Sequence, residues 1–279
     1  QDGLTSKKEF PLLKQMAEKK KWKVDVVSYI DTAHASIMEE NKDYLKTYKN
    51  HLKIGGYKII LDGSPQGKTA WLTKPYEGEE SYRGNPTKTN EEVENAVHKA
   101  VEEERQLLAH CNGDAAAEQY IQACQKQPIE KLKKIRPVMI HAQTVRKDQL
   151  EEMKKIGMIP SFFIAHVYYW GDIHLKNLGE DRASSISPAK SAEELGLIYT
   201  FHQDSPVLPP NMLETIWCAV NRTTKNGVLL GKEEQISVYE ALKAVTIWAA
   251  YSYFEEEEKG SIREGKKADF VLLDKNPLK

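Results

Sequence analysis

Residues 137–165 read PVMIHAQTVRKDQLEEMKKIGMIPSFFIA, and this stretch decides the fold class. Its two apolar ends, Pro137 to Ala142 and Ile159 to Ala165, have the length and composition of buried strands. Between them, Arg146 to Lys155 repeats its apolar residues with the period of an amphipathic helix. A strand, a helix and a second strand in this order predict a parallel βαβ unit with a right-handed crossover.

The same alternation continues outward from this unit in both directions. We expect buried strands at Val24 to Ile30, Tyr57 to Leu61, Gln106 to Cys111, Pro137 to Ala142, Ile159 to Ala165 and Leu197 to His202. We expect helices at Lys7 to Lys20, Ile37 to Tyr48, Glu91 to Glu104, Ala115 to Gln125, Arg146 to Lys155, Ala189 to Leu195, Met212 to Asn221 and Val238 to Ala249. Six strands in this order predict an α/β fold, either an open parallel sheet or a (β/α)₈ barrel that lacks some of its eight strands.

The composition excludes several classes of protein. The 279 residues carry a net charge of -1, so we expect neither nucleic acid nor a membrane surface as a partner. No apolar run approaches the roughly 18 to 20 residues that span a bilayer. Three cysteines (Cys111, Cys124 and Cys218) without a C-x-x-C spacing predict neither a disulfide framework nor a zinc knuckle. They favour a reducing compartment, and therefore the cytoplasm, although the sequence carries no targeting signal that fixes the location.

Polar residues recur where the predicted strands end. His110, His141, His166 and Asp204 each lie at or just after such an end, where the sites of parallel α/β proteins collect. One histidine alone would be interpreted as structural, but neutral imidazoles and a carboxylate on one rim are typical ligands of zinc and related divalent metals. His202, two residues before Asp204, is expected to contact the metal ligands rather than to bind the metal itself. The other histidines are expected to be structural.

Lys58 lies inside the apolar run Tyr57 to Leu61, where an isolated ammonium group is costly. It must therefore be paired, neutral or modified. Carbamylation would turn it into an anionic bridge between two metal ions. The alternative is that Lys58 extends its amine to solvent or pairs with Asp62.

Several segments carry a resemblance to a known family. They are Lys58-Ile-Ile-Leu-Asp-Gly-Ser64, His110-Cys-Asn-Gly-Asp114, Ile140-His-Ala-Gln143, Ser161-Phe-Phe-Ile-Ala-His-Val-Tyr-Tyr-Trp-Gly-Asp172, His202-Gln-Asp-Ser-Pro-Val207 and Lys259-Gly-Ser-Ile-Arg-Glu-Gly-Lys-Lys-Ala-Asp-Phe-Val-Leu-Leu-Asp274. With these motifs the chain resembles the amidohydrolase superfamily over essentially its whole length. Within it, the chain resembles the amidohydrolase-3 type metal-dependent hydrolases, and especially members described as exoenzyme regulatory proteins.

The resemblance implies a fold and a division of the chain. The fold would be the (β/α)₈ TIM barrel of the amidohydrolase type, with about six of its eight strands present. Residues 1–258 would form this barrel, and residues 259–279 would be one piece of a small β-sandwich. The family's His-x-His pair is absent from the sequence, and Gln1-Asp2-Gly3 resembles the segment after the family's second strand. We therefore expect the chain to lack roughly the N-terminal third of a full-length member.

The resemblance also implies a role for each site residue. Lys58 would be the bridging carbamylated lysine, and His110 and His141 would bind one or two divalent ions, with zinc expected. Asp204 would bind metal and transfer a proton, and His166 would contact the substrate or its transition state. The sequence also departs from the family pattern at Ile140 and Gln203. These departures bear on which substrate is bound more than on metal binding.

The implied activity is hydrolysis of a small-molecule amide, or of another non-peptide C–N bond, by a metal-activated hydroxide. Tyr168 and Trp170 could bind the substrate's apolar part, and packing in the core is an equal alternative for them. A second hypothesis is a catalytically inactive fragment with a binding or regulatory role, because the His-x-His pair is absent. An open sheet would then expose edge strands, which favours a homodimer. A third is an unrelated phosphate-binding protein that uses Gly63 and Gly67.

Overall fold

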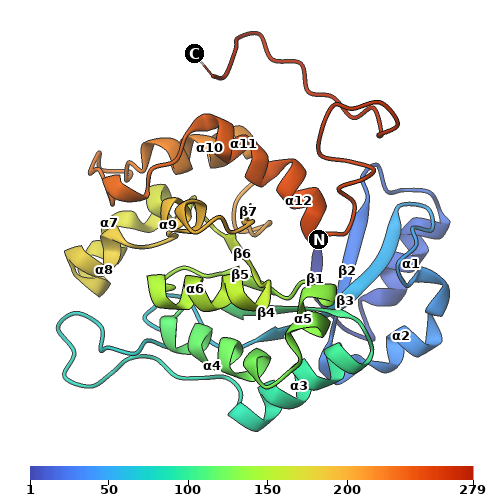
Figure 1. Ribbon diagram of the computed structural model, residues 1–279, viewed down its shortest axis with the longest axis horizontal. Helices are drawn as coiled ribbons and strands as arrows, with labels where there is room; N and C mark the ends of the chain where they lie inside the picture. The colour runs from blue at the N-terminus through green and yellow to red at the C-terminus, as the bar shows by residue number, and fades with distance from the viewer. Residues whose placement is uncertain (279) are drawn as a thin grey trace.

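The computed structural model describes residues 1–278 and contains one parallel sheet of seven strands in sequence order (Figure 1). The strands are β1 (Asp2–Thr5), β2 (Val26–Asp31), β3 (Leu52–Ile60), β4 (Gln106–Cys111), β5 (Val138–His141), β6 (Ile159–Phe162) and β7 (Thr200–Phe201). Each strand pairs with the next, so β1 and β7 form the two edges of a partial barrel. The predicted α/β class and the parallel order are confirmed.

Helices surround the sheet on its outer side. They are α1 (Phe10–Glu18), α2 (Ser36–Glu40), α3 (Asn90–Glu102), α4 (Asp114–Gln125), α5 (Ile129–Ile135), α6 (Lys147–Ile156), α7 (His166–Leu178), α8 (Glu180–Ser184), α9 (Ala189–Glu194), α10 (Met212–Asn221), α11 (Val238–Val245) and α12 (Ile247–Ser252). In Figure 1, α3 and α4 lie below the strands, α7 to α9 at the left and α10 to α12 above. No helix within residues 1–278 is both long and apolar enough to cross a bilayer.

Several expectations about single elements were wrong. Strand β1 was missed because Asp2-Gly-Leu-Thr5 contains no apolar run. The helix predicted from Ile37 to Tyr48 ends at Glu40, because the side-chain amide of Asn41 donates to the carbonyl of Ile37 and the backbone turns out of the helix. Helix α7 was also missed.

The sheet separates an inner from an outer apolar cluster. The inner cluster consists of Val27, Tyr29, Leu108, Val138, Ile140 and Ile159, with Tyr48, Tyr251 and Tyr253 packed against it. Met139 lies between Val138 and Ile140 in sequence but belongs to the outer cluster under the helices. This alternation with period two places Lys58 and His110 on the inner side, because Lys58 pairs with Leu108 and His110 lies two residues further along β4.

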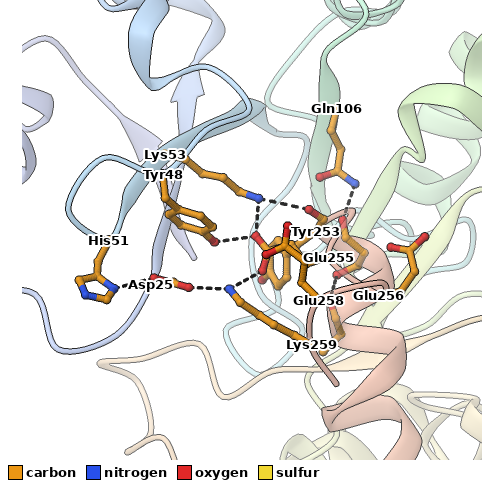
Figure 2. A network of polar contacts seen from close by, with 12 residues as sticks. Asp25, Tyr48, His51, Lys53, Gln106, Tyr253, Glu255, Glu256, Glu258 and Lys259 are labelled. Atoms are coloured by element: carbon orange, nitrogen blue, oxygen red, sulfur yellow. Dashed lines mark hydrogen bonds and ion pairs between the residues drawn. The ribbon is translucent and has the colours of Figure 1, made fainter. Parts of the chain in front are cut away.

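The chain after α12 closes the amino ends of the strands through polar contacts (Figure 2). Glu255 binds Lys53 at the start of β3 and accepts a hydrogen bond from Tyr48 at 2.7 Å. Lys259 bridges Glu255 and Asp25, at 2.6 and 2.5 Å. We call these residues (Asp25, Tyr48, Lys53, Glu255 and Lys259) the floor network.

Beyond the floor network the chain leaves the barrel. Residues 260–278 contain turns, bends and backbone without regular secondary structure, and there is no strand among them. Phe270, Val271 and Leu272 are largely exposed. An extended segment becomes a strand only when a partner strand satisfies its backbone. The β-sandwich assignment of residues 259–279 stays a prediction, and Lys279 lies outside the described residues.

Candidate metal centre

Three side chains meet at the carboxyl ends of β5 and β7. His141 is the last residue of β5, and His202 and Asp204 follow β7. One ligand atom from each lies within 4.8 Å of the other two. The Nδ1 of His141 lies 3.2 Å from Nε2 of His202, whose Nδ1 lies 3.0 Å from the hydroxyl of Ser161. The structure thus brings together two predicted ligands, His141 and Asp204, with His202, which was expected only behind them.

The backbone aims His141 into the barrel. Strict alternation along β5 would turn His141 away from Ile140 and toward the helices. Instead φ is 73° at His141 and 45° at Ala142, and the His141 ring packs against His110 with centroids 4.5 Å apart. Asp204 also has a positive φ, 53°. Such backbone conformations cost about 1–3 kcal/mol per non-glycine residue and cluster at functional sites.

Burial keeps these imidazoles neutral. It lowers the pKa of His141 well below the usual range, and the neighbouring His110 and His202 lower it further. Burial also lowers the pKa of His202 to about 3. A neutral imidazole retains the lone pair that binds a metal, so no proton needs to be displaced near neutral pH.

Lys58 lines the same cavity as His202 and Asp204. The cavity has a volume of about 410 Å³ and runs along the inner side of the sheet beside β1 and β7. The Lys58 side chain occupies the space that a side chain at Gly3 would fill. Among residues 1–278 it has no ion-pair partner, and burial lowers its pKa, while Asp204 and Asp2 raise it. Lys58 does not pair with Asp62.

Asp62 contacts His110 instead. Its Oδ1 lies 3.2 Å from Nδ1 of His110, without the alignment of a hydrogen bond. The carboxylate accepts backbone N–H groups from Trp71, Asn112 and Gly113 at 2.7–3.0 Å, which fixes it in place. Carboxylates commonly orient metal-binding histidines in this way. We had not singled out Asp62 for the site, although its position directly after β3 was a signal.

The predicted substrate-binding residues come from α7. His166 is its first residue rather than a strand end, and its ring packs on Phe163 and Trp170 with centroids 4.7 and 4.6 Å away. Phe163 in turn lies 5.3 Å from the His202 ring, so the His166 cluster lies next to the three ligands. Tyr168 packs on Trp217 at 5.6 Å.

A second buried histidine lies behind His166. His174 places Nε2 3.0 Å from Nδ1 of His166. We had expected His174 to be structural, yet the spacing of His166, Trp170 and His174 at i, i+4 and i+8 puts all three on one helix face. This spacing can be found in the sequence, but it indicates a shared face only if residues 166–178 are known to form a helix.

Titration of His174 is expected to make folding stability depend on pH. Burial lowers its pKa to about 4, from about 6.5 in an unfolded chain. Because only the unfolded state binds this proton between those values, the free energy of unfolding falls as the pH drops from about 6.5 to 4, by up to ~1.4 kcal/mol per pH unit. His174→Phe should reduce that slope in urea unfolding of metal-free protein at pH 7, 6 and 5.

The exposed His98 on α3 supplies the control for this experiment. His98→Phe should keep the wild-type slope. An identical slope in His174→Phe and the parent would show that His174 already takes up its proton in the folded state.

Comparison with known proteins identifies the family. The model of the amidohydrolase family matches residues 1–279. The chain belongs to the amidohydrolase family. It is 29% identical to the putative amidohydrolase YtcJ of Bacillus subtilis over 82% of this chain and 43% of that protein. It is 28% identical to N-substituted formamide deformylase of Arthrobacter pascens over 50% of this chain and 26% of that enzyme.

A solved structure extends the similarity to the fold. The uncharacterized metal-dependent hydrolase of Pyrococcus furiosus superposes with a TM-score of 0.85 at 25% identity, covering 100% of this chain and 56% of that one. The predicted family and the predicted partial barrel are therefore confirmed. This amidohydrolase chain spans about half the length of the relatives that it matches.

Proposed function

We propose that the protein is a metal-dependent hydrolase whose metal is held in part by His141, His202 and Asp204. The single observation that carries this proposal is the convergence of these three ligand atoms within 4.8 Å at the carboxyl ends of β5 and β7. Two neutral nitrogens and one carboxylate are a donor set that suits zinc, the ion we propose. The fit is supported by Asp62, whose Oδ1 lies 3.2 Å from Nδ1 of His110, the imidazole that packs against His141.

His110 and Lys58 are proposed as additional ligands. The His110 ring already packs on His141, and Lys58 faces the cavity from β3. Lys58 could serve in this role only as an anionic carbamate, and the lowered pKa of its amine favours the neutral form that reacts with carbon dioxide.

We assign the reaction to hydrolysis of a C–N bond in a small molecule. A bound divalent ion would polarise the scissile carbonyl and lower the pKa of the attacking water. Asp204, partly exposed at the cavity, would accept the water's proton and return it to the leaving nitrogen. The named activity of the deformylase relative makes N-substituted formamides the first substrates to assay. The alternative of an inactive fragment is less favoured, because three ligands converge without the His-x-His pair.

Metal content tests the proposal directly. Protein expressed from the whole source gene with zinc should contain at least one ion per chain by elemental analysis. His141→Ala should lower zinc affinity at least tenfold, because it removes one of three converging ligands. Dialysis against a chelator should abolish hydrolysis of N-substituted formamides, and zinc should restore it.

His98→Ala, at an exposed position on α3, should bind zinc as the parent does. A parent without metal, or a His141→Ala variant with unchanged affinity, would overturn the assignment. If the protein binds metal but hydrolyses no C–N substrate, the assignment of the metal centre stands and the assignment of the reaction is wrong.

A further inference from the structure

His166 and His174 form a buried pair of imidazoles beside the three metal-binding side chains. Both rings are almost fully enclosed, with 3% and 0% of their residue surfaces exposed. The rings are nearly parallel, with an angle of 9° between their planes and centroids 5.3 Å apart. The contact of 3.0 Å between Nδ1 of His166 and Nε2 of His174 requires a proton on one of these two nitrogens.

Two arrangements of that proton are available to a neutral pair. If Nδ1 of His166 is the donor, His174 must carry its own proton on Nδ1. If Nε2 of His174 is the donor, its Nδ1 is a bare lone pair. The Nδ1 of His174 is enclosed and has no partner within residues 1–278. A buried N–H without an acceptor is rarer in proteins than an unused acceptor, so the second arrangement is favoured.

We infer that His174 is a positioning residue that donates from Nε2 to Nδ1 of His166 and so holds His166 in the tautomer protonated at Nε2. The Nε2 of His166 is not fully enclosed and makes no hydrogen bond to any residue in 1–278. It is therefore available as a neutral N–H donor, and Phe163 packs against both the His166 ring and the His202 ring, with centroids 4.7 and 5.3 Å away.

The effect of this N–H donor on catalysis rests on the proposed hydrolysis reaction. Attack of water on an amide carbonyl places negative charge on the carbonyl oxygen. A preorganised N–H donor in a site shielded from water stabilises that charge. The opposite tautomer of His166 would present a lone pair at Nε2 and repel the same oxygen. His174 would thus decide whether His166 stabilises or opposes the charge.

The tautomer can be observed without any assay of activity. In ¹⁵N spectra of the histidine-labelled protein, we expect a pyridine-type shift at Nδ1 of His166 and a pyrrole-type shift at Nε2. His174→Phe retains a ring but removes the donor, and signals of the Nδ1-protonated tautomer should then appear. His174→Gln, whose amide reaches the position of Nε2, should restore the parent spectrum. His98→Phe, at an exposed site, should leave the His166 signals unchanged.

The outcomes separate this inference from the proposed reaction. A pyrrole-type shift at Nδ1 of His166 in the parent overturns it, and so does a His166 spectrum that His174→Phe leaves unchanged. If His174→Phe does not fold, the ¹⁵N spectrum of the parent protein is by itself the test of the inference. In an active enzyme, His174→Phe should lower kcat about 10- to 100-fold with KM and metal content nearly unchanged, and His174→Gln should recover most of the loss. The predicted tautomer in a protein without hydrolase activity would reject only the reaction.

Discussion

Asp204→Asn is expected to lower kcat for C–N hydrolysis by about 10²- to 10⁴-fold, the usual contribution of a general base. The amide of asparagine can still offer an oxygen to a metal, but it cannot accept the water's proton. His141 and His202 keep their positions near this oxygen, so metal content should stay close to the parent value. Steady-state kinetics on N-substituted formamides, with elemental analysis of the same samples, measure both quantities.

An exposed carboxylate provides the matched control. Asp43 lies on the turn Lys42–Tyr44, where it pairs with Lys49, and Asp43→Asn should keep parental kinetics. Activity of Asp204→Asn within a few-fold of the parent would remove Asp204 from the role of base. Loss of metal together with activity would reassign Asp204 to metal binding alone.

Glu255→Ala is expected to destabilise the fold by about 3–5 kcal/mol, because it leaves a buried charge without its partner. The side chains of Lys53 and Glu255 are only 9% and 10% exposed. Glu255 also binds Tyr48 and Lys259, so one substitution breaks every contact that it makes in the floor network. The free energy of unfolding in urea measures the effect.

Two further variants distinguish the effect of breaking the buried ion pair from the effect of simply removing a charge. Glu39→Ala breaks an exposed pair in which the Glu39 and Lys42 side chains are 75% and 69% exposed. It should change the free energy of unfolding by less than about 1 kcal/mol. The double variant Lys53→Met/Glu255→Leu removes both buried charges and should recover much of the loss. A loss below 1 kcal/mol for Glu255→Ala would mean that water reaches Lys53 in the folded protein.

The sequence predicted the fold class because apolar runs and charged helices alternate regularly. It also predicted that His141 and Asp204 share one rim, since strand ends of a parallel sheet meet at one side. It could not predict how His141 faces inward, because this depends on a left-handed backbone at a non-glycine residue. For the same reason His202 was underestimated, as its contact with His141 depends on that turn.

Helix α7 shows a different limit of sequence patterns. Its start, His166-Val-Tyr-Tyr-Trp170, is rich in β-branched and aromatic residues, which favour strands. Packing of Val167 and its neighbours into the outer cluster overrides this preference. The local pattern therefore hid the spacing that places His166 and His174 on one face.

The floor network also sets an order of events during synthesis. Lys53 leaves the ribosome 202 residues before its partner Glu255, a delay of about 10–40 s at ordinary elongation rates. Strands β2 to β4 can pair long before then, but Lys53 stays hydrated until residues 255–259 arrive. The amino ends of these strands in the amidohydrolase are therefore covered only after residues 255–259 have been synthesised.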